Sequence, residues 1–335
     1  MQAEFRVATF NLENLEWTPT GEEAFARRKA VLDPMLRELD ADVLCLQEIG
    51  AHRPSAHAPR RFTALDRLLS GGPYENYHRA ASTRPGGPFP ADVHNLVILS
   101  RFPILERRQI HHDIVPRQSW RPPHEGGPEP EPVEIAFDRP LLYACIALPN
   151  ETRLHVIDLH LRAPRPAPVP GALGARAVAE GQFLAAQKRE GQALEARLFA
   201  ETLFDLEADA RIVVCGDFNA DEHDAPTRIL AGEGKDEAHL FRPMEEFVPQ
   251  EKRYSVIHAG RPTLIDHVLA SRSLARTCAG AFLLNRGLED EVYAPEPIVG
   301  SLHAPLVASF RLEPTEGPWR LELGPNGPAG LARFG

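Results

Sequence analysis

The sequence is poor in cysteine and has no long apolar segment. Its four cysteines form no CxxC pair, and three of them (Cys45, Cys145 and Cys215) lie inside apolar runs, which predicts buried free thiols in a reducing compartment. No run approaches the length of about 18 apolar residues that a membrane-spanning helix needs. The first residues also lack the basic start and apolar stretch of a signal peptide. These absences predict a cytoplasmic protein with no membrane span.

Basic residues are too few and too scattered for binding of duplex nucleic acid by charge alone. The net charge is −10, and there is no run of five or more basic residues. The composition therefore indicates no preference for DNA or RNA, and no feature indicates a protein partner. An acidic chain can still be a metalloenzyme, because bound divalent cations add positive charge that the sequence does not count.

Proline is abundant, at 32 of 335 residues, nearly twice the usual share of about 5%, which predicts long, stiff loops. Short runs rich in Val, Ile and Leu predict strands over residues 5–10, 41–47, 95–100, 140–148, 153–161, 211–218, 263–271 and 305–310. Two segments have helical periodicity, 22–40 and 179–207. The first places Phe25, Leu32, Leu36 and Leu39 on one face, and Pro34 is expected to kink it or to start a second helix. Many strands with few helices between them predict packed sheets flanked by helices, an α+β fold.

Polar side chains follow or begin several of the predicted strands. They are Asn11, Glu13, Gln47, Glu48, His160, Asp217, Asn219, Asp266, His267 and His303. Ligand sites in layered folds gather where strands end. Hard oxygen donors such as Glu48 and Asn11 suit Mg²⁺ or Mn²⁺, and a carboxylate such as Asp217 can orient or deprotonate a water molecule. The amide of Asn219 can donate to a phosphoryl oxygen. This chemistry fits phosphodiester hydrolysis.

Each of these residues also has a purely structural interpretation. Asn11 is of a type common in turns, and Asp217 can close an Asx-turn with the backbone two residues on. Glu48 can be a solvated strand end, and His160 alternates with apolar neighbours like a half-buried histidine. Adjacent His111 and His112 are interpreted as structural, because neighbouring residues on a strand point to opposite faces.

The order of the motifs decides between these interpretations. Asn11 in "TFNLENL" is followed by "LQE", "LSRFPI", "HL", "GDFN", "IDH" and "SLH", and a helix contains Arg189 and Gln192 in "REGQA". This order resembles the endonuclease/exonuclease/phosphatase superfamily, which has the deoxyribonuclease-I-like fold. The match runs from Thr9 to about Phe310, which predicts one domain over 1–312 and a Pro/Gly-rich tail over 313–335. The resemblance implies a four-layer sandwich of two packed, mainly antiparallel β-sheets flanked by helices, with the site at one end.

The resemblance also implies roles for individual residues. Glu48 and Asn11 correspond to ligands of a Mg²⁺ or Mn²⁺ ion, and Glu13 to an acidic position that some members also use. His160 corresponds to a donor to the phosphate. Arg139 is a further candidate for contact with the substrate.

The remaining catalytic positions lie in the second half of the chain. Asp217 corresponds to the group that orients or activates the water, and Asn219 to a phosphate-holding amide. Asp266 corresponds to the residue that orients His303. The family usually has Ser-Asp-His where this chain has Leu302 between serine and histidine, which puts a second metal ligand in doubt.

The function predicted from the sequence is therefore metal-dependent hydrolysis of a phosphoester, by a phosphodiesterase with nuclease-type chemistry. Its partner is a phosphoester substrate, and nucleic acid is one candidate. The alternative is a phosphatase or phospholipase acting on a small or lipid headgroup substrate. A further alternative, suggested by Leu302, is a binding module without catalytic activity.

Overall fold

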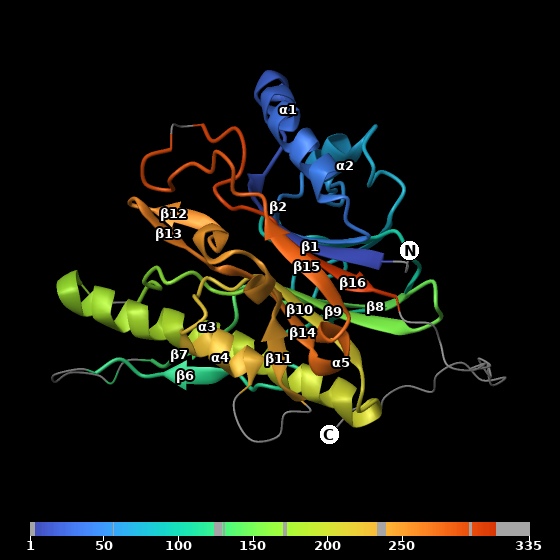
Figure 1. Cartoon of the computed structure of the whole chain (residues 1–335). Helices are drawn as coiled ribbons and strands as arrows, with labels where there is room; N and C mark the ends of the chain where they lie inside the picture. Colours follow the sequence, from blue (N-terminus) through green and yellow to red (C-terminus); the bar gives the residue numbers. More distant parts are fainter. Residues whose placement is uncertain are drawn as a thin grey trace.

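Two six-stranded β-sheets pack face to face in the computed structural model (Figure 1). The structure describes residues 4–55, 57–123, 129, 131–169, 173–232, 239–294 and 297–312. The predicted tail over 313–335 lies outside the described residues, so the division of the chain at residue 312 stays a prediction. None of the described helices is long and apolar enough to cross a membrane.

Each sheet has one parallel pair of strands at its centre and antiparallel pairs on either side. The first sheet, in the order β15-β16-β1-β2-β4-β3, contains β1 (Glu4–Leu15), β2 (Val43–Ile49), β3 (His78–Ala81), β4 (Asn95–Ser100), β15 (Cys278–Leu283) and β16 (Leu306–Arg311). The second, in the order β11-β14-β10-β9-β8-β5, contains β5 (Ile104–Ile110), β8 (Leu141–Ala147), β9 (Arg153–His160), β10 (Arg211–Asp217), β11 (Phe241–Pro243) and β14 (Asp266–Ser271). The parallel pairs are β1 with β2 and β9 with β10. The predicted sandwich of mainly antiparallel sheets is confirmed.

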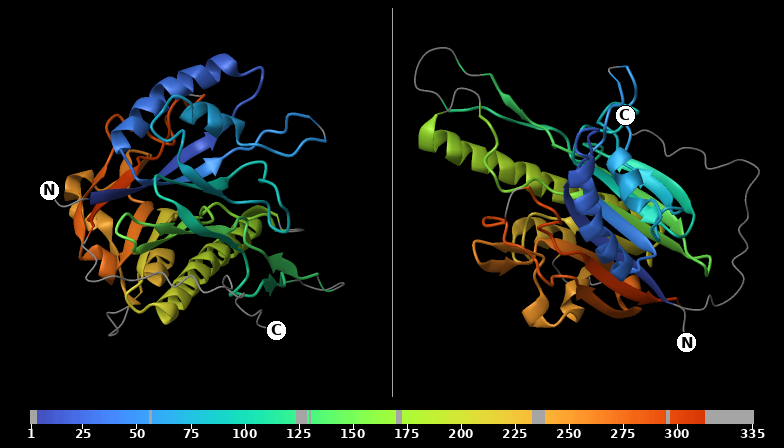
Figure 2. Two further views of the ribbon diagram at one scale, coloured as in Figure 1. Left: turned by 90° about the vertical axis from the view of Figure 1, so that its right-hand side faces the viewer. Right: turned by 90° about the horizontal axis from the view of Figure 1, so that it is seen from above.

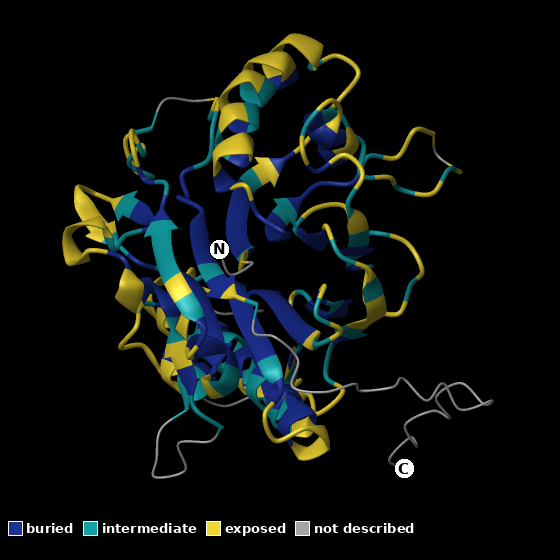
Figure 3. Ribbon diagram, turned by 45° about the vertical axis from the view of Figure 1, so that its right-hand side comes forward, coloured by how far each residue is buried: buried dark blue, intermediate teal, exposed yellow. Residues whose placement is uncertain are grey.

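Helices cover the outer face of each sheet, which completes the four layers. The first sheet packs against α1 (Glu22–Leu39) and α2 (Thr63–Leu69), and the second against α3 (Gly174–Leu206) and α4 (Ala225–Ala231). Figure 3 shows the buried strands inside and exposed outer faces on the helices. The short elements are α5 (Arg272–Ala275), η2 (Met244–Phe247), η3 (Gln250–Lys252), and two hairpins formed by β6 (Gln118–Trp120) with β7 (Val133–Ile135) and β12 (Val256–His258) with β13 (Arg261–Thr263).

Apolar residues fill the space between the sheets and under the helices. The core between the sheets includes Val7, Cys45, Val156 and Cys215, so two of the predicted buried thiols lie there; Cys145 is buried on the other face of the second sheet. Full burial of an aliphatic side chain such as that of Val156 contributes about 1.5–3 kcal/mol to the stability of the fold.

The two predicted helices are both present. The four apolar residues expected on one face of α1 are all buried, and α1 continues through Pro34 as a single helix. The second, α3, extends beyond the sheet at its N-terminal end, where the β6–β7 hairpin lies beside it (Figure 2). There Trp120 contacts Phe183, with ring centroids 4.9 Å apart.

Candidate active site

The strand order brings the predicted polar residues to one edge of the sandwich. Parallel strands end at the same edge, and their antiparallel neighbours begin there. Asn11 and Glu48 therefore lie near the ends of β1 and β2, and His160 and Asp217 at the ends of β9 and β10. The same edge receives the residues that start or precede the antiparallel neighbours: Arg139 before β8, Asp266 at the start of β14, and His303 before β16.

Local irregularities in the backbone direct these side chains into the site. The pairing of β1 with β2 shifts register after Asn11, and that of β2 with β4 shifts after Leu46. Positive φ angles occur at Glu13 (48°), Glu48 (60°) and Asn219 (49°). Such conformations are costly for residues other than glycine and collect at functional sites.

The carboxylate of Asp217 both closes an Asx-turn and faces the candidate active site. Its Oδ1 accepts the backbone N–H of Asn219 at 2.9 Å, which is the Asx-turn. Its Oδ2 faces the site, 3.0 Å from Asn11 Nδ2 and 3.3 Å from His160 Nε2. The amide nitrogen of Asn219 donates to Asp217 Oδ2 and to the carbonyl of Leu161. In this arrangement Asn219 fastens Asp217 rather than presenting free N–H groups.

The glycine of the same motif is required by the close approach of β9. Gly216 has a φ of 138°, and a Cβ atom there would lie 1.8 Å from the carbonyl oxygen of Leu159. Only glycine leaves room for β9 and β10 to pair up to the site.

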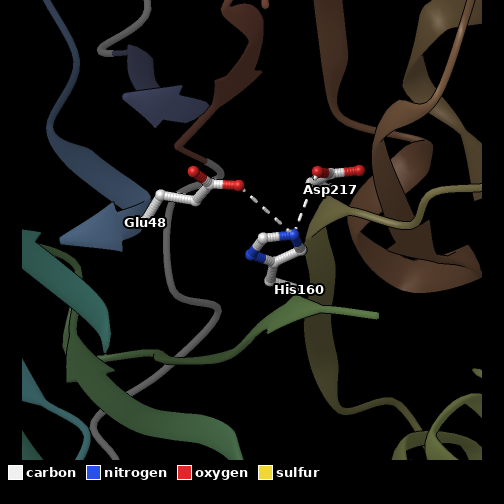
Figure 4. A group of neighbouring side chains, drawn as sticks. All are labelled: Glu48, His160 and Asp217. Atoms are coloured by element: carbon white, nitrogen blue, oxygen red, sulfur yellow. Dashed lines mark ion pairs between the residues drawn. The ribbon is translucent and has the colours of Figure 1, made fainter. Parts of the chain in front are cut away.

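Glu48 lies opposite Asp217, with His160 between them (Figure 4). Glu48 Oε1 is 3.7 Å from His160 Nε2 and 3.3 Å from Asn11 Nδ2. The Asn11 side-chain oxygen accepts the backbone N–H of Glu13 at 2.9 Å. A guanidinium N–H of Arg139 donates to His160 Nδ1. Since guanidinium has no acceptor, Nδ1 carries no proton, and the proton of neutral His160 lies on Nε2, facing the two carboxylates.

Asp266 and His303, 37 positions apart in sequence, are hydrogen-bonded. His303 Nδ1 lies 2.8 Å from Asp266 Oδ2. Ser301 holds this loop in place, because its hydroxyl donates to the carbonyl of Asn11 and accepts the backbone N–H of His303. Between them Leu302 is 5% exposed and offers no ligand atom.

The site accumulates negative charge in a buried setting. Burial raises the pKa of Asp217 to about 7; the charge of His303 opposes this shift, whereas those of Asp266 and Glu48 add to it. Burial and the neighbouring Glu48 also raise the pKa of Glu13. Burial lowers the pKa of His160 well below its usual value, with a further contribution from Arg139. Burial favours neutral His303 too, but Asp266 outweighs it and raises the pKa of His303 well above the usual value.

The sequence can be placed by comparison with known proteins. The model of the Endonuclease/Exonuclease/phosphatase family matches residues 8–288. The chain belongs to this family. None of the curated proteins compared with the sequence matches it.

Solved structures share the fold at low sequence identity. A truncated TDP2 of Caenorhabditis elegans is 15% identical, with a TM-score of 0.56, over 92% of this chain and 98% of that chain. An AP endonuclease from Archaeoglobus fulgidus is 18% identical, with a TM-score of 0.53, over 92% and 100%. A mannosyl-6-phosphatase from Bacteroides thetaiotaomicron is 16% identical, with a TM-score of 0.55, over 91% and 98%. At these identities the likeness shows the fold alone.

Members of the endonuclease/exonuclease/phosphatase family are hydrolases that use divalent metals, and the donor atoms of this chain fit such an ion. Glu48 and Asp217 each offer a carboxylate oxygen, and these oxygens and a ring nitrogen of His160 all lie within 4.8 Å of one another. Because Nδ1 of His160 is bonded to Arg139 and Nε2 carries the proton, His160 lies beside such an ion as a hydrogen-bond donor and not as a ligand. Buried carboxylates with raised pKa values are what a divalent cation neutralises, and oxygen donors suit a hard cation. Glu13 and Asn11 lie next to this group.

Two residues that the sequence analysis did not identify also belong to the site. His94, just before β4, has a φ of 57° and its ring lies edge-on to that of His160, with Nδ1 3.9 Å from Glu48 Oε2. Arg28 of α1 donates to the carbonyls of Asn14 (3.0 Å) and Gly300 (3.3 Å). It therefore ties the end of β1 to the loop that carries His303.

Other candidate residues have structural roles. His111 and His112 do not lie on a strand as assumed, because β5 ends at Ile110; their rings bond to backbone atoms of Val115 and Phe137. The side chain of His267 points away from Asp266 and bonds to Glu245 and the carbonyl of Ala220.

Gln192, in the helix motif that resembles the family, supports the site from α3. It accepts the backbone N–H of Arg162 at 3.0 Å and donates to the carbonyl of Arg139 at 3.2 Å. Gln192 therefore fixes two loops, the one that carries Arg139 and the one that follows His160.

Proposed function

We propose that this protein is a Mg²⁺- or Mn²⁺-dependent phosphodiesterase with nuclease-type chemistry. The observation that carries the proposal is the convergence of Glu48, Asp217 and His160 at one edge of the sandwich, with the Asp266–His303 pair beside them. An AP endonuclease among the structures with this fold is in keeping with it.

Asn11, Glu13 and Glu48 would hold the metal ion, with Asp217 next to them. When bound, the ion neutralises charge on the phosphate and acts as a Lewis acid. His160 donates its Nε2–H to a phosphoryl oxygen, because Arg139 occupies its other nitrogen.

Asp217 orients the attacking water and removes its proton. A pKa near 7 suits this task, because a base works best near the operating pH. Asp266 keeps His303 charged and oriented, so that His303 stabilises the negative charge that gathers in the transition state. Asn219 holds Asp217 in position.

The test compares a diester with a monoester. Purified protein is assayed with bis(4-nitrophenyl) phosphate and 4-nitrophenyl phosphate in Mg²⁺, Mn²⁺ or EDTA. We expect metal-dependent turnover with preference for the diester, and Glu48→Gln should abolish most of it while raising the metal concentration needed. Glu23→Gln, on the exposed face of α1, is the control.

Two outcomes favour other functions. Preference for the monoester indicates a phosphatase, which the mannosyl-6-phosphatase with the same fold makes the second candidate. No turnover of either compound with any divalent metal indicates a binding module without catalytic activity.

A further inference from the structure

A groove lined by arginines lies over the loops that follow β2 and precede β4, close in sequence to residues of the active site. It consists of two adjoining cavities, of about 350 and 490 Å³, that share Arg53, Arg60 and Asp92. The smaller one includes Gly50, two residues after Glu48, and Glu16, three residues after Glu13. The larger one adds Arg84 and Phe89 from the loop before β4. We call the two together the arginine groove.

The walls of the arginine groove are fixed to each other. The backbone N–H of Ala51 donates to the carbonyl of Asp92 at 2.7 Å. Asn95 donates to the carbonyl of Ile49 at 2.8 Å and accepts the N–H of Ala91 at 2.8 Å. The loop after β2 and the loop before β4 therefore form one preorganised surface, which lowers the entropy cost of binding a ligand there.

The chemistry of the groove is that of an anion site with an aromatic platform. Arg60 forms an ion pair with Asp92, whereas Arg84 is exposed and forms no ion pair within the described part of the chain. Its backbone N–H bonds to the carbonyl of Phe89 at 2.9 Å, which places the two residues together across the loop. The ring of Phe89 is 53% exposed. In a chain of net charge −10, this guanidinium and an exposed ring that line the same cavity indicate a ligand with both a phosphate and a planar ring.

We propose that the arginine groove binds a nucleotide unit joined to the scissile phosphate, so that the substrate is a single-stranded nucleic acid. This inference rests on the proposed phosphodiesterase function. A phosphomonoester has no second phosphate for a guanidinium beyond the metal site. The larger cavity also has apolar lining residues, among them Pro59, Pro88 and Pro90, so binding of a lipid is one of the outcomes that the test below distinguishes. Stacking of a base on an aromatic ring with backbone contacts from arginine is the usual mode of binding to single strands.

The experiment measures binding separately from catalysis. Anisotropy of a fluorescein-labelled 12-nucleotide oligothymidylate is followed in EDTA over a range of salt concentrations, for the full chain and for Arg84→Ala and Phe89→Ala. Controls are Arg286→Ala and Leu206→Ala, exposed residues. Leu206 ends α3, which leads into the start of β10, so it lies toward the opposite edge of the sheets. Arg286 follows β15, the outer strand on the other side of the first sheet from β3 and β4, and pairs with Glu38.

We expect Phe89→Ala to weaken binding on the order of tenfold, the effect of losing one stacked base. Arg84→Ala should reduce the slope of log K against log salt by about 0.7, the value for one phosphate on a single strand. Both variants should hydrolyse bis(4-nitrophenyl) phosphate in Mn²⁺ like the wild type, with KM raised only for the oligonucleotide.

Three results overturn the inference. Wild-type affinity in both variants shows that the groove is no substrate subsite, and hydrolysis of the small diester would then still support the proposed function. Loss of binding to phosphatidylserine vesicles in Phe89→Ala, with oligonucleotide binding intact, indicates a lipid ligand. Equal binding of the oligonucleotide and of inorganic polyphosphate, in the wild type and in Phe89→Ala, shows that the ring contributes nothing. If the wild type binds the oligonucleotide through Phe89 but does not cleave the small diester, the proposed phosphodiesterase function is wrong. Binding of a single-stranded nucleic acid in the arginine groove is then still supported.

Discussion

Replacing Asp217 with asparagine changes both the catalytic base and the electrostatic energy of the site. The carboxylate is 2% exposed and lies among Asn11, Asn219 and His160, all of which face its Oδ2. Asparagine preserves the shape but has only one acceptor oxygen, and it does not ionise. Because a general base typically contributes about 10²–10⁴-fold, kcat should fall by that factor.

The effect of the same substitution on stability depends on pH. The folded-state pKa of Asp217 is raised from 3.8 to about 7, so this group's contribution to stability is complete below pH 3.8 and is lost as the pH rises through 7. About 3 pH units at 1.36 kcal/mol each amount to roughly 4 kcal/mol. Loss of hydrogen bonds to the carboxylate offsets about 1.5–3 kcal/mol of this. In the absence of metal, the variant should therefore be more stable than the wild type at pH 8 by about 1–2.5 kcal/mol, and the difference should vanish or reverse at pH 5.

Urea unfolding in EDTA at the two pH values measures this difference, and single-turnover rates per folded molecule measure the catalytic loss. Asp158→Asn is the matched control. Asp158 is a fully buried carboxyl on β9 that bonds to Gln47 outside the site, and burial raises its pKa well above the usual value. Its replacement should therefore leave kcat unchanged. A variant at 217 that retains most of its kcat, or that is less stable than the wild type at pH 8, contradicts this account.

Three further changes test other parts of the site. Leu302→Asp should tighten Mg²⁺ binding measured by calorimetry; equal affinities show that position 302 is not a ligand position here. His303→Ala should lower kcat more than it raises KM, and Asp266→Ala should add little once His303 is gone, because the two act as a unit; losses that simply multiply in the double-mutant cycle contradict this. Gly216→Ala should destabilise the fold by more than about 3 kcal/mol in denaturant unfolding, since its Cβ would lie 1.8 Å from the carbonyl oxygen of Leu159; a normal unfolding midpoint would mean that β9 and β10 can separate without cost.

The strands that the sequence predicted are the interior strands of the two sheets. The eight apolar runs correspond to β16, β1, β2 and β4 in one sheet and to β14, β10, β9 and β8 in the other. The four edge strands, β15, β3, β11 and β5, were missed. β3 and β11 are short, and β5 carries exposed charges in "ILERRQI", as is usual for protected edges. β15 has the sequence "CAGAFL", in which small residues replace the Val, Ile and Leu that mark the interior strands. Periodicity therefore finds strands that are buried between neighbours and misses the borders.

The candidate site was predictable where a motif follows an interior strand. Asp217 and Glu48 are of this kind. His94 was not identified because it precedes its strand, and only the antiparallel pairing of β4 with β2 shows that this end lies at the site. Arg28 gave a signal that was not used, since it lies between Phe25 and Leu32 on the apolar face of α1, where a charge needs a partner.

The two halves of the site come from different sheets, and the first sheet takes its strands from both ends of the described chain. Asn11 is synthesised nearly three hundred residues before His303. The Asp266–His303 pair forms only when β16 returns to lie beside β1. A nascent chain that has not yet made β16 therefore lacks the Asp266–His303 pair, so its active site is incomplete while the chain is still being synthesised.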